Sequence, residues 1–81
     1  MTLRYTIILE YDAEGPGYVV SVPALPGCFT QGSTVPEAIE RAREAIAGHV
    51  AALREIGEDV PIEDSPALMT VVEVEALGSA D

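Results

Sequence analysis

The start of a long helix is the feature that most constrains this chain. Thr34 and Glu37 have the Thr-x-x-Glu spacing of a capping box, in which the threonine oxygen accepts from the Glu37 N–H and the carboxylate returns to the Thr34 N–H. Pro36 falls in the first turn, where a missing N–H costs nothing. An apolar stripe follows at three- and four-residue spacing, and its members are Ile39, Ala42, Ile46, Val50 and Leu53. We predict a helix over residues 35–56, stopped by Gly57, with Gly48 marking a close packing contact.

Three short strands are predicted ahead of this helix. Apolar residues alternate with others over residues 3–11 and 18–22, and residues 28–31 follow a Pro-Gly turn. Turn-forming residues separate these segments. A last alternating segment, residues 68–77, follows an acidic connection that contains prolines. The order β-β-β-α-β predicts an α+β fold in which one helix covers one face of a four-stranded sheet. We assign residues 1–77 to a single domain and 78–81 to a disordered tail.

The small size of the chain predicts self-association. With 81 residues and four aromatic side chains, the core is thin, and chains of this size often need disulfides, metals or oligomerisation. One cysteine and one histidine rule out an intrachain disulfide and argue against a zinc site, so we expect no metal or cofactor. We therefore predict a dimer or tetramer that uses the uncovered sheet face or a sheet edge. The candidate interface residues are Ile8, Val19 and Val71.

The charge of the chain indicates what kind of partner it can bind. Fourteen acidic residues against four arginines give a formal net charge of −10, which argues against nucleic acid and anionic membranes as partners. The charge suits a basic partner, or it serves only solubility. Three glutamates on one helix face are candidate partner-binding residues, or simply a solvated surface: Glu37, Glu40 and Glu44. The absence of a signal-peptide pattern and of a membrane-length apolar run predicts a cytoplasmic protein.

The order of several motifs resembles the HicB-like antitoxin family. They are the opening Tyr strand, the acidic-glycine hairpin, Tyr18-Val19-Val20 leading to Pro23, Leu25-Pro26-Gly27-Cys28, Gln31-Gly32-x-Thr34 with Glu37-Ala38, Glu44-Ala45 in the helix, and residues 57–61, GEDVP. The resemblance implies a partial RNase H-like fold with a mixed sheet, whose last strand lies parallel to the first. It also implies inhibition of a HicA-type toxin, a small basic protein that cleaves mRNA, by masking its RNA-binding or active face. Many family members continue into a DNA-binding segment, whereas we expect no direct nucleic-acid binding from this chain, which has no basic cluster.

Catalysis is the least favoured hypothesis, and we expect a protein that is not an enzyme. A metal-dependent nuclease needs converging carboxylates, for which the candidates are Glu10, Asp12, Glu73 and Glu75. We interpret these residues as the solvated faces of strands. His49 has no patterned nucleophile or acid beside it, and Cys28 has no basic neighbour, so we interpret both as packing or surface residues. The alternative to an antitoxin-like binding protein is a self-assembling scaffold that has no toxin partner.

Overall fold

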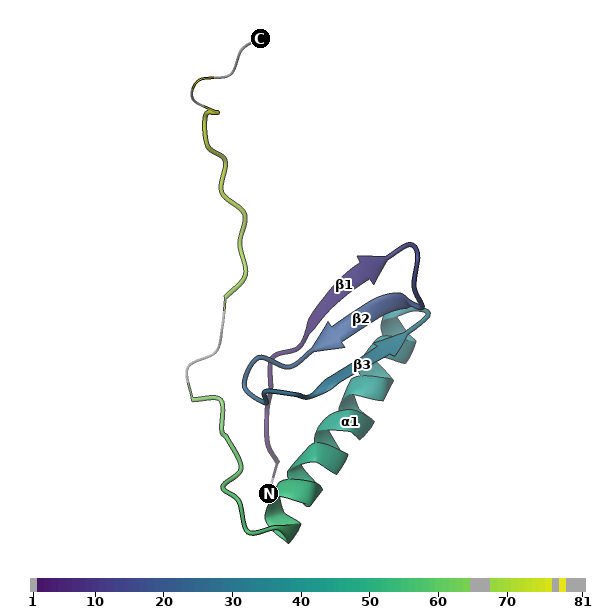
Figure 1. The fold of residues 1–81 in the computed structure, drawn as a ribbon, viewed down its shortest axis with the longest axis vertical. Coiled ribbons are helices and arrows are strands. Elements are labelled where there is room, and N and C mark those ends of the chain that lie inside the picture. Colours follow the sequence, from purple (N-terminus) through teal and green to yellow (C-terminus); the bar gives the residue numbers. More distant parts are fainter. Residues whose placement is uncertain (1, 65–67, 77, 79–81) are drawn as a thin grey trace.

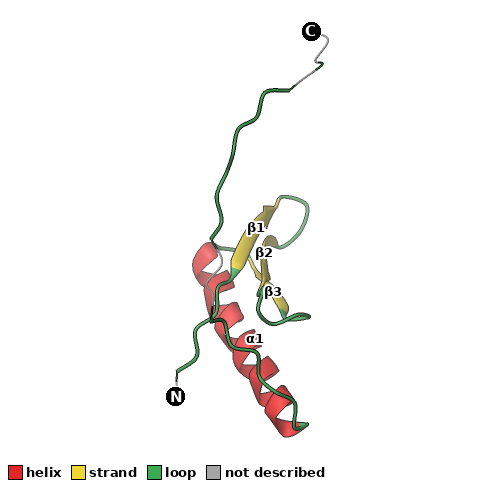
Figure 2. Cartoon of the chain, turned by 90° about the vertical axis from the view of Figure 1, so that its left-hand side faces the viewer, coloured by secondary structure: helices red, strands yellow, loops and turns green. Residues whose placement is uncertain are grey.

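A three-stranded antiparallel sheet lies against one long helix in the computed structural model, which describes residues 2–64, 68–76 and 78. The sheet order is β1-β2-β3, and the helix covers one face (Figure 1). The chain then returns past the N-terminal segment and runs on beyond the sheet (Figures 1 and 2). The elements are β1 (Ile8–Asp12), β2 (Gly17–Ser21), β3 (Phe29–Gly32) and α1 (Val35–Glu55).

Both predicted turns between the strands are confirmed. In the β1–β2 hairpin the Asp12 carboxylate accepts from the Glu14 N–H at 3.0 Å and its carbonyl from the Gly15 N–H at 3.2 Å. In the β2–β3 turn the Cys28 N–H donates to the Leu25 carbonyl at 3.0 Å. Gly27 there has φ of +85°, a conformation that favours glycine after the proline of such a turn. Because this turn uses the Cys28 N–H, β3 begins at Phe29, one residue later than predicted.

The predicted helix is confirmed at both ends. The Thr34 hydroxyl oxygen accepts from the Glu37 N–H at 3.2 Å. The Glu37 carboxylate accepts from the N–H of Ser33, not from that of Thr34 as expected. At the other end Gly57 has φ of +78° and donates to the Arg54 carbonyl, while Glu58 donates to the Leu53 carbonyl. This pair of hydrogen bonds is a Schellman motif, which satisfies carbonyls that the last helical turn leaves free.

The core lies between the sheet and α1, but the helix presents a slightly different stripe from the predicted one. Its buried residues are Ala38, Ala42 and Val50, whereas Ile39 remains 36% exposed. They pack with buried residues of the sheet and its turn, which are Val20, Val22, Leu25 and Cys28. The side chains of Leu3, Tyr5, Ile7 and Leu9 flank these two clusters. The stripe turns toward Ala38 because β3 approaches the first turn of α1 closely.

Gly32 permits this close approach. A Cβ atom at Gly32 would lie 2.5 Å from the Ala38 nitrogen and 2.7 Å from the Ala38 Cα. Cβ atoms in proteins essentially never approach other atoms this closely. The backbone of β3 therefore touches the backbone of α1, and the small side chain of Ala38 fills what space remains. The prediction of a close packing contact at Gly48 is wrong, because a Cβ atom there would meet no other atom within 4 Å.

Two predicted strands differ in the structure. The first is shorter than 3–11, because the ladder ends at the pair Ile8 and Ser21. Beyond this pair β2 turns away, and Pro23 has no N–H with which to extend the ladder. The strand predicted at 68–77 is not confirmed. Its described residues, 68–76, join no sheet, and residue 77 lies outside the described residues, as do 79–81 of the predicted tail. Over the residues that the structure describes, the fold is therefore α+β with three strands.

The Gly32 contact predicts opposite effects for the same substitution at two glycines. Gly32→Ala should destabilise the protein by about 1–3 kcal/mol, because backbone atoms on both sides must separate. Gly48→Ala should stabilise it by about 0.5–1 kcal/mol, because alanine has less conformational freedom to lose in a helix and the site is open. Urea denaturation of both variants measures these changes. Equal stability of the two variants would contradict the close contact.

Candidate functional site

The carboxylates proposed for nuclease chemistry are not brought together. Glu10 and Asp12 lie exposed on β1, while Glu73 and Glu75 lie exposed in the extended segment beyond the sheet. Across residues 2–64, 68–76 and 78, no group of three or more histidine, cysteine or acidic residues could hold a metal ion. The described structure thus gathers no set of ligands for metal-assisted hydrolysis.

Cys28 occupies a packing position, whereas His49 lies part-way between the core and the surface. Cys28 is buried in the core with Val22, Leu25 and Val50. Burial raises the pKa of its thiol, so the reactive thiolate is disfavoured. His49 is half-buried on α1. The interpretation of Cys28 as a packing residue is therefore confirmed.

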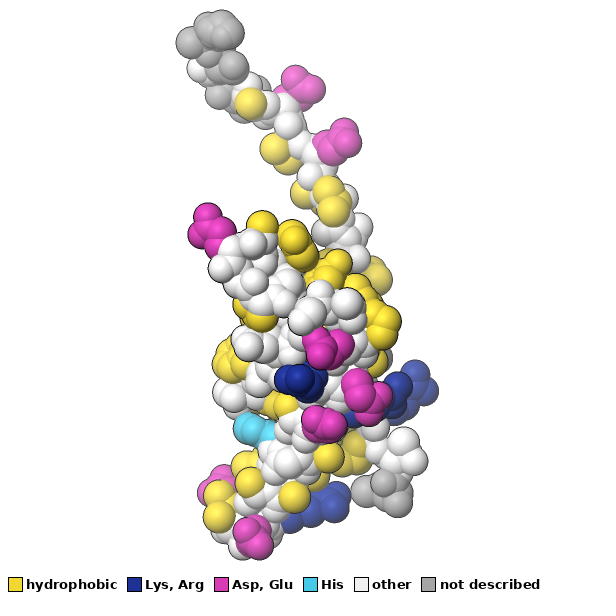
Figure 3. Space-filling model, turned by 90° about the vertical axis from the view of Figure 1, so that its right-hand side faces the viewer, with side chains coloured by type: hydrophobic (Ala, Val, Ile, Leu, Met, Phe, Trp, Pro, Cys, Tyr) yellow, Lys and Arg dark blue, Asp and Glu magenta, His cyan; other side chains and the backbone are white. Residues whose placement is uncertain are grey.

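The acidic residues of α1 are partly neutralised by arginines of the same helix. Glu37 lies 3.6 Å from Arg41, and Glu40 lies 3.8 Å from Arg43. The backbone hydrogen bond from Ser33 is the main reason that the pKa of Glu37 is lowered. Four glutamates against three arginines leave α1 with a formal charge of only −1. Figure 3 shows acidic and arginine side chains interspersed over this side of the molecule.

Most of the negative charge lies outside the helix. The β1–β2 hairpin and the connection after α1 carry the larger groups of acidic residues, and the extended segment carries two more. These residues are Glu10, Asp12 and Glu14; Glu58, Asp59, Glu63 and Asp64; and Glu73 and Glu75. A basic partner would therefore meet a field that comes mainly from the hairpin and the connection.

The outer face of the sheet is uncovered and partly apolar. Ile8 pairs with Ser21, and Glu10 pairs with Val19, so the side chains of Ile8 and Val19 point to the same face, away from α1. Phe29 pairs with Ser21 on this face and is 67% exposed, although the sequence pattern did not single it out. Val71, the third candidate interface residue, lies in the extended segment and not on this face.

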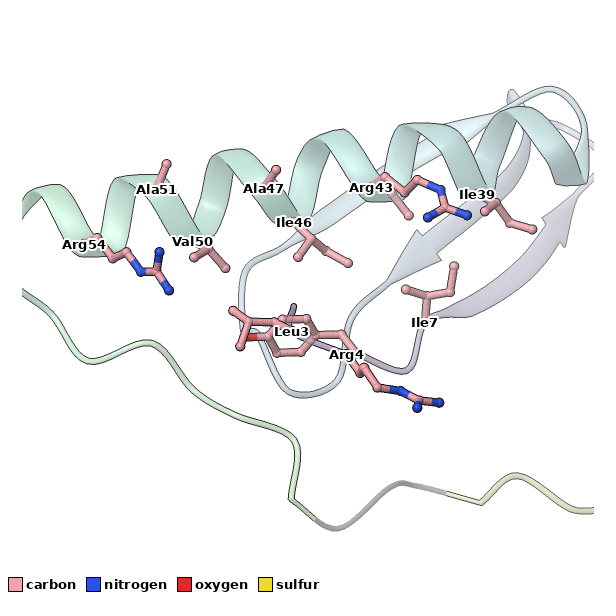
Figure 4. Close-up of a pocket in the computed structure, with 12 residues that line it drawn as sticks. Leu3, Arg4, Ile7, Ile39, Arg43, Ile46, Ala47, Val50, Ala51 and Arg54 are labelled. Atoms are coloured by element: carbon pink, nitrogen blue, oxygen red, sulfur yellow. The ribbon is translucent and has the colours of Figure 1, made fainter. Parts of the chain in front are cut away.

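A second open surface lies between α1 and the N-terminal segment. We call it the α1 groove (Figure 4). It has a volume of about 720 Å³. Its apolar lining includes Leu3, Ile7, Ile39 and Ile46, and three of the four arginines of the chain lie along it: Arg4, Arg43 and Arg54. The groove therefore combines an apolar floor with positive charge, in a protein that is otherwise strongly acidic.

Glu63 holds the connection after α1 against the N-terminal segment. One carboxylate oxygen accepts from the Thr6 N–H at 2.7 Å and the other from the Thr6 hydroxyl at 2.5 Å. Nearby, the Tyr5 hydroxyl donates to the Pro61 carbonyl at 2.6 Å. These contacts join residues that lie 56 and 57 positions apart in the sequence. They place the chain beside the N-terminal segment just before the last alternating residues begin.

The 68–76 arm, as we call residues 68–76, leaves the body of the molecule (Figures 1 and 2). Its large apolar side chains are between 71% and 90% exposed: Leu68, Met69, Val71, Val72 and Val74. The radius of gyration is 16.6 Å, against about 12 Å for a compact chain of this length. Burying such a side chain stabilises a protein by about 1.5–3 kcal/mol, so the arm carries a large apolar surface without a cover.

Comparisons with known proteins place the chain in a recognised group. Residues 5–76 match the model of a family described as HicB_like antitoxin of bacterial toxin-antitoxin system. A UPF0150 protein of Thermoplasma acidophilum is 44% identical over 63 residues, which are 78% of this chain and 90% of that protein. Antitoxin HicB 1 of Photorhabdus laumondii is 40% identical over 60 residues, which are 74% of this chain but 38% of that protein.

A solved structure supports the same grouping. The crystal structure of the N-terminal domain of the Burkholderia pseudomallei antitoxin HicB superposes with a TM-score of 0.61 at 39% sequence identity. The match covers 76% of this chain and 69% of that one. The relatives that carry a functional name are antitoxins, which is consistent with a protein that is not an enzyme. Within the described part of the chain, α1 is too polar to cross a membrane.

The contact between Glu63 and Thr6 predicts a pH-dependent stability. Both hydrogen bonds from Thr6 lower the pKa of Glu63 below the ordinary value of about 4.3 for glutamate. This contribution is therefore present above about pH 4.3 and is lost as the pH falls through the folded-state pKa. Glu63→Gln should lower the urea midpoint at pH 7, and the difference from the parent should shrink on acidification to pH 3. Glu55→Gln, at an exposed helix residue, is the control. A midpoint difference for Glu63→Gln that is independent of pH would contradict the contact.

Proposed function

The chain belongs to the HicB-like antitoxin family, and from this premise we propose that it neutralises a small basic toxin of the HicA type. In this proposal the toxin cleaves mRNA, and the antitoxin acts in the cytoplasm by covering the RNA-binding or active face. The observation that carries the proposal is the family match over residues 5–76 together with the formal net charge of −10. Inhibition by occlusion requires a complementary surface and no catalytic group on the antitoxin.

Electrostatics would make this recognition fast and selective. A toxin that binds RNA presents positive charge where the phosphates lie, and an acidic protein competes for the same field. The helix residues Glu37, Glu40 and Glu44 are proposed to face the toxin. Because Arg41 and Arg43 compensate two of these glutamates, we infer that the acidic hairpin and connection supply the long-range attraction, while the helix supplies local contacts.

We also propose that the protein forms a dimer or tetramer, and that residues 68–77 supply the fourth strand of a partial RNase H-like fold, parallel to the first strand. The open edge of β1, the uncovered outer face and the exposed arm support this proposal, because each leaves apolar surface or unpaired backbone in a single copy. Ile8, Val19 and Val71 remain the proposed interface residues. Residues 1–77 are proposed to act as one domain.

A self-assembling scaffold without a toxin is the alternative function. The exposed arm favours it, because self-association alone would account for that surface. The two functions differ in one readily tested respect. An antitoxin forms a stoichiometric complex with a basic protein encoded beside it and abolishes the RNase activity of that protein, whereas a scaffold forms only assemblies of its own chain.

The toxin-binding proposal is tested by neutralising the helix glutamates. Together, Glu37→Gln, Glu40→Gln and Glu44→Gln should weaken binding of the HicA-type toxin encoded beside this chain about tenfold. The affinity falls because the local contacts of the helix with the toxin are lost. Toxin RNase activity is titrated with each variant. The control is Glu10→Gln, Glu14→Gln and Glu55→Gln, which changes the net charge equally and should slow association without a comparable loss of affinity. Equal weakening by both sets would contradict a specific role for the helix face, and a toxin that the parent chain does not inhibit would contradict the function.

A further inference from the structure

We propose that Tyr11 and Tyr18 form an aromatic platform, at the end of the β1–β2 hairpin, that receives an arginine side chain of the basic toxin. The inference rests on the proposed function for the identity of the partner. It adds the place on this chain where that partner makes close contact. The contact is made by tyrosine rings, while the acidic side chains around them supply the field that favours a cation.

The two tyrosines lie opposite each other across the hairpin. Tyr11 of β1 pairs with Tyr18 of β2, and their ring centroids lie 5.3 Å apart with an interplanar angle of 63°. This edge-to-face geometry is a favoured arrangement of two aromatic side chains. Tyr18 is half-buried, because it packs against the core cluster that contains Ala38 and Ala42. Tyr11 is 68% exposed. One ring is therefore anchored at the core and supports the other at the surface.

The end of the hairpin is fixed against the start of α1. Gly17 begins β2, and a Cβ atom there would lie 2.8 Å from the Ser33 carbonyl oxygen and 3.0 Å from that of Gly32. The next residue, Tyr18, pairs with Gly32 in the sheet. The N-terminal end of α1 accordingly lies behind the end of the hairpin (Figure 1). Because backbone contacts hold the platform in place, little ordering is needed when a partner binds to it.

The platform continues onto the first turns of α1. Val35 lies one turn before the buried Ala38 and is 41% exposed, and Ile39 is 36% exposed. Glu37 is also near, because its carboxylate accepts from the N–H of Ser33, the residue against which the end of the hairpin packs. Aromatic, apolar and acidic groups thus lie together at the start of α1. The platform and the local helix contacts proposed above belong to one surface.

The charges around the platform favour a cation. Residues 8–21, which span the hairpin, contain three acidic residues and no lysine or arginine. Glu10 and Asp12 flank Tyr11 in β1, and alternation points their side chains to the other face of the sheet, so they do not cover its ring. An arginine binds the face of a tyrosine ring through its charge and its planar shape. A protein that binds RNA carries such cations where the phosphates lie, so the proposed toxin can supply one.

Tyrosine ring signals test the platform without any toxin. The full chain, labelled with ¹³C in its tyrosines, is titrated with a hexa-arginine peptide and followed by NMR. The ring signals of Tyr11 and Tyr18 should move, whereas that of Tyr5, which packs against the other core cluster, should not. Tyr11→Leu should raise the dissociation constant of the peptide about threefold to tenfold, because the cation loses the ring. Tyr11→Phe keeps a ring and should stay within about twofold of the parent.

Phe29→Leu is the matched control. The Phe29 ring is 67% exposed, nearly the same fraction as that of Tyr11, but it lies on the outer face of the sheet. This variant should therefore bind the peptide as the parent does. Circular dichroism of each variant establishes that it is folded. Tyr11 signals that do not move, a Tyr11→Leu variant that binds as tightly as the parent, or an equal loss in Phe29→Leu would each overturn the platform.

Titration of toxin RNase activity with the same variants separates this inference from the proposed function. Tyr11→Leu should inhibit the HicA-type toxin encoded beside this chain about threefold to tenfold less tightly than the parent, and Phe29→Leu should not differ from it. If Tyr11→Leu inhibits as well as the parent, the platform is not a toxin contact, although the function stands. A parent chain that does not inhibit the toxin would overturn the function and with it the identity of the partner, while the peptide titration would still decide whether the rings bind arginine.

Discussion

The backbone contact between β3 and α1 is the constraint on which the rest of the structure depends. Gly32 allows the strand to approach the first helical turn at Ala38, and Thr34 fixes where that turn begins. The short segment between them cannot change its length without rotating the helix on the sheet. This contact therefore decides that Ala38, Ala42 and Val50 enter the core and that Ile39 and Ile46 turn toward the groove.

The same geometry explains why the molecule has both a small buried core and open apolar surfaces. Three strands cover only part of the apolar stripe of α1, so the remainder lines a groove beside the β1 edge. The 68–76 arm also carries apolar side chains, and its valines are largely exposed. A protein of this size stabilises itself with few buried side chains, and association is a common way to bury more. The open surfaces and the small core are two consequences of one short chain.

The charge distribution separates the two kinds of interaction proposed here. The arginines of α1 pair with its glutamates and line the groove, while the acidic excess lies on the hairpin, the connection and the arm. A basic toxin would be attracted by the acidic excess, and a second copy could bury the exposed apolar surfaces. The family match supports the first role and the uncovered surfaces support the second. Both roles rely on surface complementarity, and neither requires catalysis by this chain.

The sequence by itself determined where the helix begins and ends and where the chain turns between strands, because local chemistry controls these features. The capping residue Thr34, the stop at Gly57 and the turn at Gly27 all lie where their residue types predict, because each depends on neighbours within a few positions. The motif order also identified the family, which the comparisons confirm. Only the tertiary structure decided which side of the helix stripe is buried, that Glu63 binds Thr6, and that residues 68–76 join no sheet of their own copy. Alternation of apolar and polar residues indicates that a segment can bury one face. It carries no information on which surface will bury it, because that depends on distances between residues far apart in the chain.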